Sequence, residues 1–416
     1  MKNRLLARHI RKKSRTNFGR IIVVTGARQT GKTTLIRNRF QDYRYISLED
    51  PVTRPHYTSL SASQWQSSYP VAALDEIQKA PRLFESIKAV YDLYPHTKYL
   101  LLGSSQIHLL ERIKESLAGR SSLVELFPLT LPERLTRSWD DAIGESKMAR
   151  WLQDSTFDLE IFNGIPPADD RYVEAEKHFQ SYLHFGGMPA IVGGEIETEE
   201  KFDWLTNYNR TYLQRDLRDL ANLRDLEPFV TLQKALAGST AQTLNSSHLA
   251  RLCGISAKTA KRFLSYLELS YQVVLLKPWF KNLNKRLAKS PKVHFLDPGV
   301  QRALISRRGE ISGGEFESAV VSEIYRQIKS HRLPVDLYHL RTVDGREVDL
   351  ILELESGYVP IEIKSTARVS PFDARHLELS QILDRPVIHS FILSNDNQVR
   401  RIDRQVSALP AVWFLS

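Results

Sequence analysis

Eight residues near the N-terminus have the types and the spacing that bind phosphate. Residues 26–33 read Gly-Ala-Arg-Gln-Thr-Gly-Lys-Thr, the pattern of a phosphate-binding loop, directly after the β-branched run at residues 21–24. The glycines let backbone N–H groups approach phosphate oxygens at the positive end of a helix dipole. Lys32 would contact the β and γ phosphates of ATP, and the Thr33 hydroxyl would ligate Mg2+. The expected ATP-binding residues are Gly26, Ala27, Arg28, Gln29, Thr30, Gly31, Lys32, Thr33 and Thr34.

Two adjacent acids follow a second apolar run. Residues 71–74 read Val-Ala-Ala-Leu and precede Asp75 and Glu76. If the run is a parallel strand, both acids lie at the edge of the sheet where a nucleotide crevice opens. Asp75 can then hold Mg2+ through water, and Glu76 can polarise the attacking water as the catalytic base. The pair suits activation of water better than transfer to a bound hydroxyl, which disfavours a small-molecule kinase.

Two further residues are candidates for this reaction. Ser105 follows an apolar run at residues 99–102, and its hydroxyl could sense the γ-phosphate or orient the water. An ordinary strand-to-loop turn explains Ser105 equally well. Arg120 could neutralise transition-state charge in its own subunit or in a neighbouring one, although a surface arginine is the commoner explanation.

These residues need a parallel sheet with helices on both faces to bring them together. Besides residues 21–24, strands are expected at residues 43–48, 71–74 and 99–102. Apolar residues recur at helical spacing after Pro81, so a helix is expected between the last two strands. The alternation predicts a doubly wound α/β fold for the N-terminal part of the chain.

A second group of charged residues lies near the C-terminus. Glu362 and Lys364 are two residues apart and therefore share one side of a strand expected at residues 358–363. A neighbouring strand at residues 347–352 can place Asp349 beside them. Asp349 and Glu362 could hold a divalent metal, Mg2+ or Mn2+, that polarises a phosphodiester, while Lys364 stabilises charge. The catalytic set would then be that of a metal-dependent nuclease.

This C-terminal region resembles the PD-(D/E)-x-K nucleases. The resemblance implies that Glu317, on a helix expected at residues 316–328, matches their helix-borne acid. The pattern itself is weak, because charged residues alternating with apolar ones also make any half-exposed strand. Since a fold does not certify its chemistry, nuclease activity stays open at this point.

The segment at residues 246–268 has the spacing of a helix-turn-helix. Gly254 supplies the turn, and Ser256 can cap a second helix that has one apolar side. The opposite side of that helix carries the candidate DNA-binding residues Lys258, Lys261 and Arg262. Residues 271–276 would form a wing strand. The alternative is a winged-helix lid or a protein-contact module.

Composition indicates a folded chain with a basic surface. The 416 residues are 42% hydrophobic and 25% charged, and the formal net charge is +10. Residues 1–20 and 277–292 are rich in Lys and Arg and contain no acid, which fits contacts with a phosphate backbone or a solvated tail and loop. No apolar run approaches the roughly 18 residues of a membrane span. With Cys253 as the only cysteine, we expect a cytoplasmic protein without a disulfide or a thiolate zinc site.

The motifs together resemble a known family. The chain is similar to the AAA-type ATPases of bacteria and archaea that carry an endonuclease-like C-terminal domain of unknown function. The segments that carry the resemblance are GARQTGKTT, LDEIQ, LLLGSSQ, LAGR followed by LFPLT, and residues 186–189, 212–216 and 285–300. The resemblance implies ATP hydrolysis, a winged-helix segment and a nuclease-like fold. Residues 137–170 depart from it and are expected to form an insertion on the ATPase surface.

The expected architecture is an α/β AAA-type phosphate-loop domain followed by three further regions. The boundaries are residues 1–135 for the ATPase core, 136–225 for an insertion and helical lid, 226–290 for a winged helix and 291–416 for an α+β restriction-endonuclease-like domain. We expect an ATPase that acts on DNA, with a homo-oligomer as an open alternative. The competing interpretation is a regulatory or signalling ATPase whose silent C-terminal domain binds a protein partner.

Overall fold

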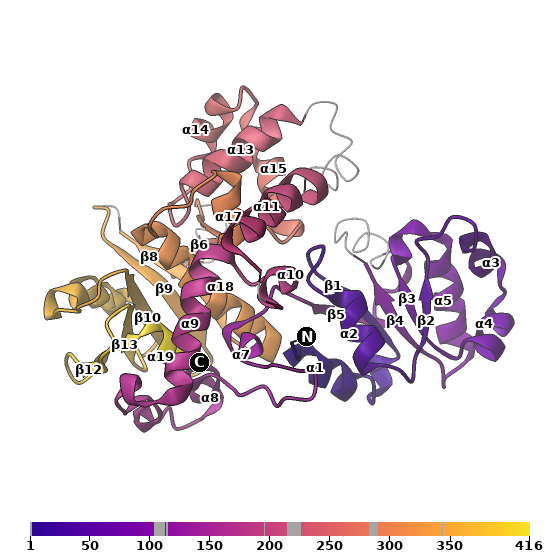
Figure 1. Ribbon diagram of the computed structural model, residues 1–416, viewed down its shortest axis with the longest axis horizontal. Helices are drawn as coiled ribbons and strands as arrows, with labels where there is room; N and C mark the ends of the chain where they lie inside the picture. The colour runs from indigo at the N-terminus through magenta and orange to yellow at the C-terminus, as the bar shows by residue number, and fades with distance from the viewer. Residues whose placement is uncertain are drawn as a thin grey trace.

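Five parallel strands form the sheet of the N-terminal lobe (Figure 1). The computed structural model describes residues 2–103, 113, 115–194, 196–213, 226–282, 290–342 and 344–416. The strands of this sheet are β1 (Ile21–Thr25), β2 (Arg44–Ser47), β3 (Val71–Asp75), β4 (Lys98–Leu102) and β5 (Ser121–Glu125). Their order is β2-β3-β4-β1-β5 and every pairing is parallel. The predicted parallel sheet is therefore confirmed, and β5 is an additional strand that its polar sequence did not indicate.

Helices cover both faces of this sheet. They are α1 (Leu5–Lys13), α2 (Lys32–Arg39), α3 (Arg54–Ser59), α4 (Ala62–Ser68) and α5 (Arg82–Leu93). Ile21 and Val23 of β1 pack with residues of α4 and α5, whereas Ile22 and Val24 pack with residues of α1 and α2. Because side chains alternate along a strand, one apolar run supplies two cores.

The N-terminal basic segment is part of this lobe. Leu6, Ala7 and Ile10 of α1 are buried against the sheet, while Arg8 and Lys12 are exposed on the outer side of the helix. A solvated tail is therefore the wrong description of this segment. The reason is that the apolar residues of α1 recur at helical spacing, so one side of the helix is apolar and becomes buried. A count of basic residues does not reveal this side.

Helices dominate the middle of the chain. They include α7 (Leu131–Arg134), α8 (Lys147–Gln153), the short 3-10 turns η3 (Leu159–Phe162) and η4 (Pro166–Ala168), α9 (Asp170–Phe185), α10 (Pro189–Val192), α11 (Thr198–Tyr208) and the π-helical turn η5 (Asn209–Leu213). A bundle of three helices follows, made of α13 (Glu227–Gly238), α14 (Ser246–Leu252) and α15 (Ala257–Leu269). These three pack on one another around Phe229 and Phe263.

The second sheet has eight strands in the order β12-β13-β11-β10-β9-β8-β6-β7. They are β6 (Val273–Pro278), β7 (Lys292–Phe295), β8 (Asp336–Arg341), β9 (Glu347–Leu354), β10 (Gly357–Lys364), β11 (Ser390–Ser394), β12 (Arg400–Arg401) and β13 (Val406–Pro410). The helical elements around it are α17 (Pro298–Leu304), α18 (Gly313–His331), η6 (Pro371–Ile382) and α19 (Ala411–Leu415). None of the helices in the described ranges is long and apolar enough to span a bilayer.

The hairpin of β6 and β7 crosses the expected domain boundary. β6 follows the three-helix bundle, pairs with β7 in antiparallel fashion and pairs with β8 in parallel fashion. A cut after residue 290 would separate β7 from the strand that it pairs with. The bundle and the C-terminal sheet therefore share this hairpin, and backbone hydrogen bonding decided the connection.

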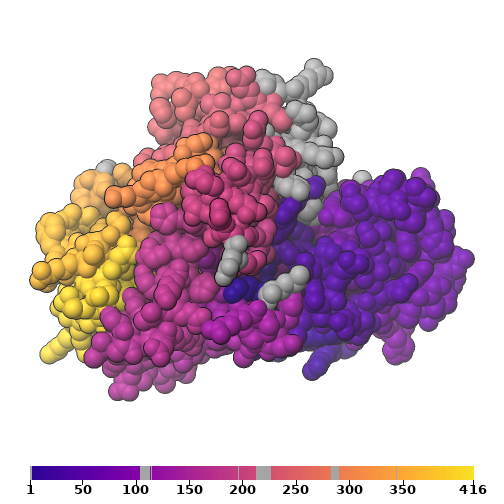
Figure 2. All heavy atoms as spheres, viewed as in Figure 1, coloured from indigo at the N-terminus to yellow at the C-terminus, as the bar shows by residue number. Residues whose placement is uncertain are grey.

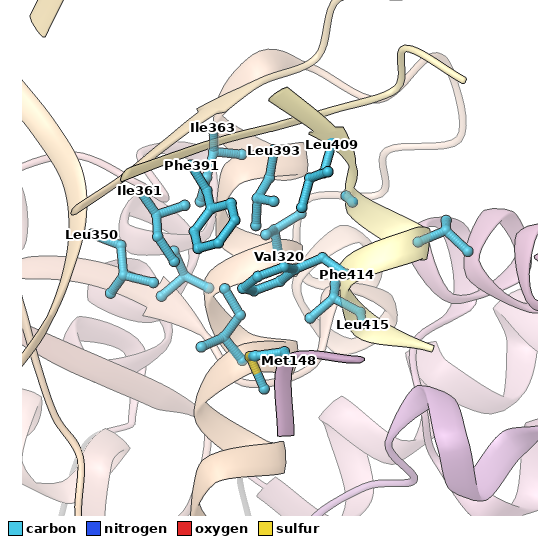
Figure 3. Packing of buried hydrophobic residues seen from close by; sticks show 14 of the residues in the cluster. Met148, Val320, Leu350, Ile361, Ile363, Phe391, Leu393, Leu409, Phe414 and Leu415 are labelled. Atoms are coloured by element: carbon cyan, nitrogen blue, oxygen red, sulfur yellow. The ribbon is translucent and has the colours of Figure 1, made fainter. Parts of the chain in front are cut away.

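Most of the expected insertion packs on the C-terminal sheet, while Trp139 near its start packs on the ATPase lobe and Asp140 pairs with Arg39 of α2. Met148 of α8 belongs to the same core as Phe391 and Phe414 (Figure 3). Trp151 of α8 is also part of this core. The indole N–H of Trp413 donates to the carbonyl of Phe162 at 2.8 Å. The placement predicted for residues 137–170 therefore holds only for their first few residues, because the side chains of Trp151 and Phe162 complete a core that lies more than 200 residues further along the chain.

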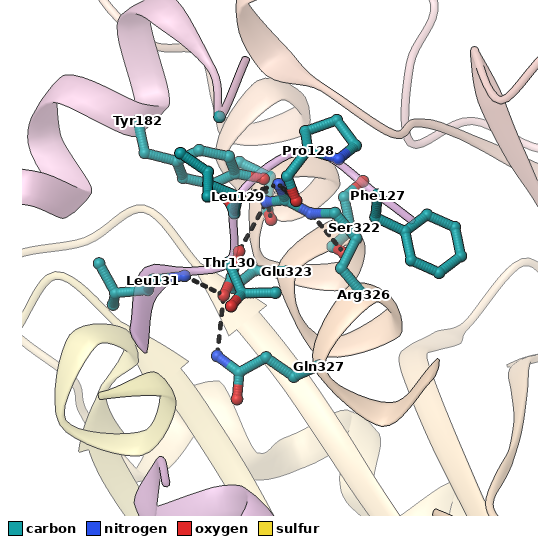
Figure 4. A network of polar contacts seen from close by, with 12 residues as sticks. Phe127, Pro128, Leu129, Thr130, Leu131, Tyr182, Ser322, Glu323, Arg326 and Gln327 are labelled. Atoms are coloured by element: carbon teal, nitrogen blue, oxygen red, sulfur yellow. Dashed lines mark hydrogen bonds and ion pairs between the residues drawn. The ribbon is translucent and has the colours of Figure 1, made fainter. Parts of the chain in front are cut away.

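A buried polar network fixes the segment that leaves the ATPase lobe (Figure 4). Arg326 of α18 donates to the carbonyl of Leu129 at 3.0 Å and pairs with Glu323 at 2.6 Å. Glu323 in turn accepts from the backbone N–H of Leu131 at 2.6 Å. Figure 2 shows the lobe as an indigo and purple bulge at one end of the molecule.

Candidate functional site

The loop between β1 and α2 has the backbone conformation of a phosphate cradle. Gly26, Gln29 and Gly31 have positive φ angles of 145°, 61° and 90°. A Cβ atom on Gly26 would lie 2.1 Å from the carbonyl oxygen of Leu126, so only glycine fits there. Successive N–H groups in such conformations, followed by a helix N-terminus, form an anion-binding concavity. The loop thus has the form that the sequence pattern requires.

Lys32 and Thr33 begin α2 beside the end of β3. The buried ammonium of Lys32 donates to the carbonyls of Gly26 and Ala27, both at 2.8 Å. The Thr33 hydroxyl donates to Asp75 Oδ2 at 2.6 Å. These oxygen donors are of the kind that Mg2+ takes, so the residues fit this ion. Thr33 would ligate it directly and Asp75 through water.

Glu76 follows Asp75 at the C-terminal edge of the sheet. Its φ of 55° turns the chain away from the strand, and Gln78 donates to its carboxylate. Burial, and then the neighbouring charge of Asp75, raise the pKa of the Glu76 carboxyl above its usual range. A carboxylate with a raised pKa, close to the phosphate loop, has the properties of a general base for water.

The loop lines a cavity of about 980 Å³ that several distant segments complete. Its lining from the loop and the start of α2 consists of Arg28, Gln29, Gly31, Lys32, Thr33 and Thr34. Trp139 from the segment after α7 and Pro189 from α10 form part of its wall. The sequence offered no signal for Trp139. The run at residues 186–189 was noted only as part of a family resemblance.

Close packing holds α10 against the cavity. The N–H of Gly187 donates to Asp297 Oδ2 at 2.7 Å, and its carbonyl accepts from the N–H of Leu129 at 2.7 Å. A Cβ atom on Gly186 would lie 1.8 Å from Asp297 Oδ1. The two glycines therefore let the chain pass between Asp297 and the ATPase lobe, which places Pro189 at the nucleotide cavity.

Arg4 is a residue of this site that the sequence did not single out. Its buried guanidinium donates to the carbonyl of Thr30 at 2.6 Å and to that of Phe127 at 2.5 Å. The same group pairs with Glu133 at 3.2 Å. Arg4 therefore joins the phosphate loop to the segment that follows β5.

Two predicted ATPase residues remain, Ser105 and Arg120. Ser105 lies outside the described residues. Arg120 precedes the first residue of β5 and makes a two-point contact with Asp92 at 2.8 and 3.1 Å. Because β5 runs parallel to β1, Arg120 lies at the edge of the sheet opposite to the phosphate loop. The structure does not bring it to the nucleotide cavity of its own chain, and action on a neighbouring chain stays a prediction.

The C-terminal residues do converge, but a lysine lies among them. The ammonium of Lys292 is 2.6 Å from Glu317 Oε1 and 3.3 Å from Asp349 Oδ1, and it also contacts Glu347. Its side chain is 3% exposed. We call Lys292, Glu317, Glu347 and Asp349 the lysine-centred cluster. Lys292 was expected in a basic stretch for phosphate contacts, and its burial shows that this expectation is wrong for this residue.

Glu362 and Lys364 lie beside the lysine-centred cluster. They pair with each other at 2.5 Å, and Asp349 Oδ2 accepts from the N–H of Ile363 at 2.9 Å. Burial, and then the charge of Asp349, raise the pKa of Glu362 to about 8. Burial and the same carboxylate raise the pKa of Glu317 well above its usual range. The four predicted residues thus meet in space.

The lysine-centred cluster does not fit a divalent metal. Both oxygens of Asp349 have partners, and Lys292 supplies the positive charge that a metal would supply. Among the described residues no group of three or more His, Cys, Asp or Glu side chains could hold a metal ion. The expected metal ligands Asp349 and Glu362 therefore lie together without forming a metal site.

The basic side of α15 faces outward. Lys258, Lys261 and Arg262 are exposed, while the apolar residues of the helix pack on α13 and α14. Lys261 lines a groove of about 920 Å³ that also has Arg341 of β8 on its wall. Hydroxyl and amide side chains around α14 complete this groove. The lining offers cations and neutral donors, the groups that contact phosphate backbones.

Comparisons with known proteins support the ATPase lobe. The family model described as "AAA domain" matches residues 19–135, which confirms an AAA-type ATPase domain. Two domains of unknown function match further along the chain, DUF8612 at residues 176–310 and DUF4143 at residues 312–414. The uncharacterized proteins Rv2008c of Mycobacterium tuberculosis and Mb2031c of Mycobacterium bovis are each 30% identical over 367 residues, which is 84% of this chain and 71% of theirs.

Two solved structures are also similar. One is the Walker-type ATPase paby2304 of Pyrococcus abyssi, 14% identical with a TM-score of 0.44 over 72% of this chain and 94% of that one. The other is the signal transduction ATPase with numerous domains PH0952 of Pyrococcus horikoshii, 11% identical with a TM-score of 0.26 over 77% of this chain and 45% of that one.

Proposed function

Because the chain belongs to the family of the mycobacterial proteins Rv2008c and Mb2031c and carries an AAA domain, we propose that it is an ATP-hydrolysing switch that acts on DNA. The observation that carries the first half is the meeting of Thr33, Asp75 and Glu76 beside the phosphate loop. The phosphate loop binds the phosphates of ATP, and Asp75 and Glu76 serve its hydrolysis. Segments outside the ATPase lobe line the same cavity.

The residues divide the work of hydrolysis between them. The loop N–H groups and Lys32 bind and orient the phosphates, and bound Mg2+ supplies neutralisation of the phosphate charge. Thr33 and Asp75 would hold that ion. Glu76 takes a proton from the attacking water, for which its raised pKa suits it. Pro189 and Trp139 close the cavity around the rest of the nucleotide.

ATP turnover by two variants tests the hydrolytic site. Lys32→Ala should abolish nucleotide binding, whereas Glu76→Gln should bind ATP normally and lose turnover by about 100-fold or more. Glu85→Gln, which changes an exposed glutamate on α5, is the matched control and should behave as wild type. Full hydrolysis by the Glu76 variant would overturn its assigned role.

The basic side of α15 and its groove support DNA as the partner. Three exposed cations on one helix, with Arg341 across the groove, present the charge that a phosphate backbone attracts. The three helices followed by the β6–β7 hairpin also have the order of elements of a winged helix. Duplex DNA binding measured over a salt series tests the partner, and an absence of binding at low salt would contradict it.

One observation favours a second candidate, a regulatory switch with a protein partner. The lysine-centred cluster argues for a C-terminal domain that is catalytically silent. Cleavage of branched, single-stranded and duplex DNA with Mg2+ or Mn2+ separates the two, with Asp349→Ala and Lys364→Ala as controls. If the wild-type protein cleaves DNA and both variants lose this cleavage, the nuclease is favoured. If the wild-type protein cleaves no DNA but hydrolyses ATP normally, the regulator is favoured.

A further inference from the structure

We propose that Lys292 supplies the positive charge of the lysine-centred cluster, in the place of a catalytic metal. The cluster then attaches the β6–β7 hairpin to the C-terminal sheet. The proposal concerns the C-terminal region alone, and neither ATP hydrolysis nor DNA binding is needed for it. It starts from the position of one ammonium group among three carboxylates.

The ammonium has a partner for each of its protons. Glu317 comes from α18, while Glu347 and Asp349 come from β9, so two elements surround a side chain that a third element, β7, supplies. An ammonium has three N–H donors and accepts nothing, which matches three carboxylates. A buried charge without such partners would be strongly unfavourable. The arrangement satisfies Lys292 fully.

The remaining oxygens leave little for a metal. Asp349 uses one oxygen for Lys292 and the other for the N–H of Ile363. Glu362 uses Oε1 for Lys364, and its buried Oε2 has no hydrogen-bond partner among the described residues. Mg2+ requires about six oxygen ligands in near-octahedral geometry. The uncommitted oxygens of Glu317 and Glu362 do not provide that set, so a metal would have to displace Lys292.

The backbone holds Lys292 in place. It is the first residue of β7 and pairs with Leu276 of β6. On its other side it forms an isolated β-bridge with Thr243. The N–H of the next residue, Val293, donates to the carbonyl of Gln242, and its carbonyl accepts from the N–H of Ala241. The backbone of Lys292 is therefore fixed within the hairpin, and its buried side chain joins the hairpin to the carboxylates of α18 and β9. Since β6 follows α15 directly, the cluster couples the position of the exposed basic helix to the C-terminal sheet.

A double-mutant cycle on the full-length protein tests whether Lys292 supplies the positive charge of the lysine-centred cluster. Lys292→Met removes the charge and keeps the length of the side chain, and we expect it to lower Tm by roughly 5 °C or more because buried carboxylates lose their partner. Glu347→Gln alone should lower Tm less. The double variant should recover part of the loss, because it removes both members of a pair. Additive losses in the double variant would overturn the pairing.

A metal titration completes the test and needs no destabilised variant. Mn2+ binding is measured by calorimetry in the Lys32→Ala background without nucleotide, and again with Asp349→Asn added. We expect no binding at the C-terminal cluster and the same isotherm for both proteins. Stoichiometric binding that Asp349→Asn abolishes would overturn the proposal, even if Lys292→Met failed to fold.

Discussion

At the scale of single residues, the nucleotide site depends on a side chain from outside the phosphate-loop motif. Arg4 spans the carbonyls of Thr30 and Phe127 with a planar group that has five donors. Its third partner, Glu133, balances the charge in a buried position. A loop rich in positive φ angles would otherwise be free to relax. Arg4 thus acts as a positioning residue for the loop.

We predict that Arg4→Lys weakens ATP binding more than it slows turnover. A lysine keeps the charge but cannot donate to both carbonyls in a fixed geometry. KM for ATP should rise about 10-fold, with kcat changed less than about 3-fold, consistent with the loss of about 1 to 2 kcal/mol of hydrogen bonding. Arg8→Lys, on the exposed side of α1, is the control. Equal behaviour of the two variants would contradict the positioning role.

At the scale of elements, α15 combines a buried side with a basic side. Ala260, Phe263 and Leu267 are buried in the three-helix bundle, and this leaves the cations outside. The spacing alone predicted both sides correctly, because an α-helix has 3.6 residues per turn in any surroundings. The spacing did not reveal Arg341 as the opposite wall of the groove, since that residue comes from another sheet strand.

We predict that removing the cations of α15 lowers the affinity for duplex DNA and flattens its salt dependence. Changing Lys258, Lys261 and Arg262 to Ala should reduce the slope of log K against log salt by about 2 to 3, because each phosphate contact contributes about 0.9. Lys234→Ala, an exposed lysine on α13, should leave the slope unchanged. Polarisation measurements with an unaltered slope for the triple variant would rule out this surface.

At the scale of the whole molecule, several histidines are buried in and beside the C-terminal sheet. His389 is 3% exposed and its Nε2 lies 2.9 Å from the Ser407 hydroxyl. Burial, and then the charge of Arg401, lower the pKa of His389 to about 4. Burial and then the charge of Lys292 lower the pKa of His339 to about 3. The folded protein therefore keeps these rings neutral at pH values at which the unfolded chain protonates them.

We predict that these histidines make the fold less stable in acid. Between pH 6.5 and pH 4 the unfolded state binds more protons, so the free energy of unfolding falls by about 1.4 kcal/mol per pH unit for each such histidine as the pH decreases. His389→Gln, which keeps a partner for Ser407, should reduce this slope in urea unfolding. His56→Gln, an exposed site, should not. Identical slopes in wild type and His389→Gln would contradict the prediction.

The sequence by itself determined the features that depend on residues close along the chain. The loop at residues 26–33, the acids that end β3 and the two sides of α15 follow from covalent spacing and from the period of a strand or helix. The parallel sheet followed from the alternation of such elements and is confirmed. The catalytic roles of Asp75 and Glu76 stay predictions.

Only the tertiary structure decided which distant segments meet. It brought Arg4 and Pro189 to the phosphate loop, and it placed residues 148–162 on the C-terminal core. It also put Lys292 beside Asp349, which the sequence had assigned to a metal. No local spacing encodes these contacts, because they join segments tens to hundreds of residues apart and form only when complementary apolar surfaces and charges pack together.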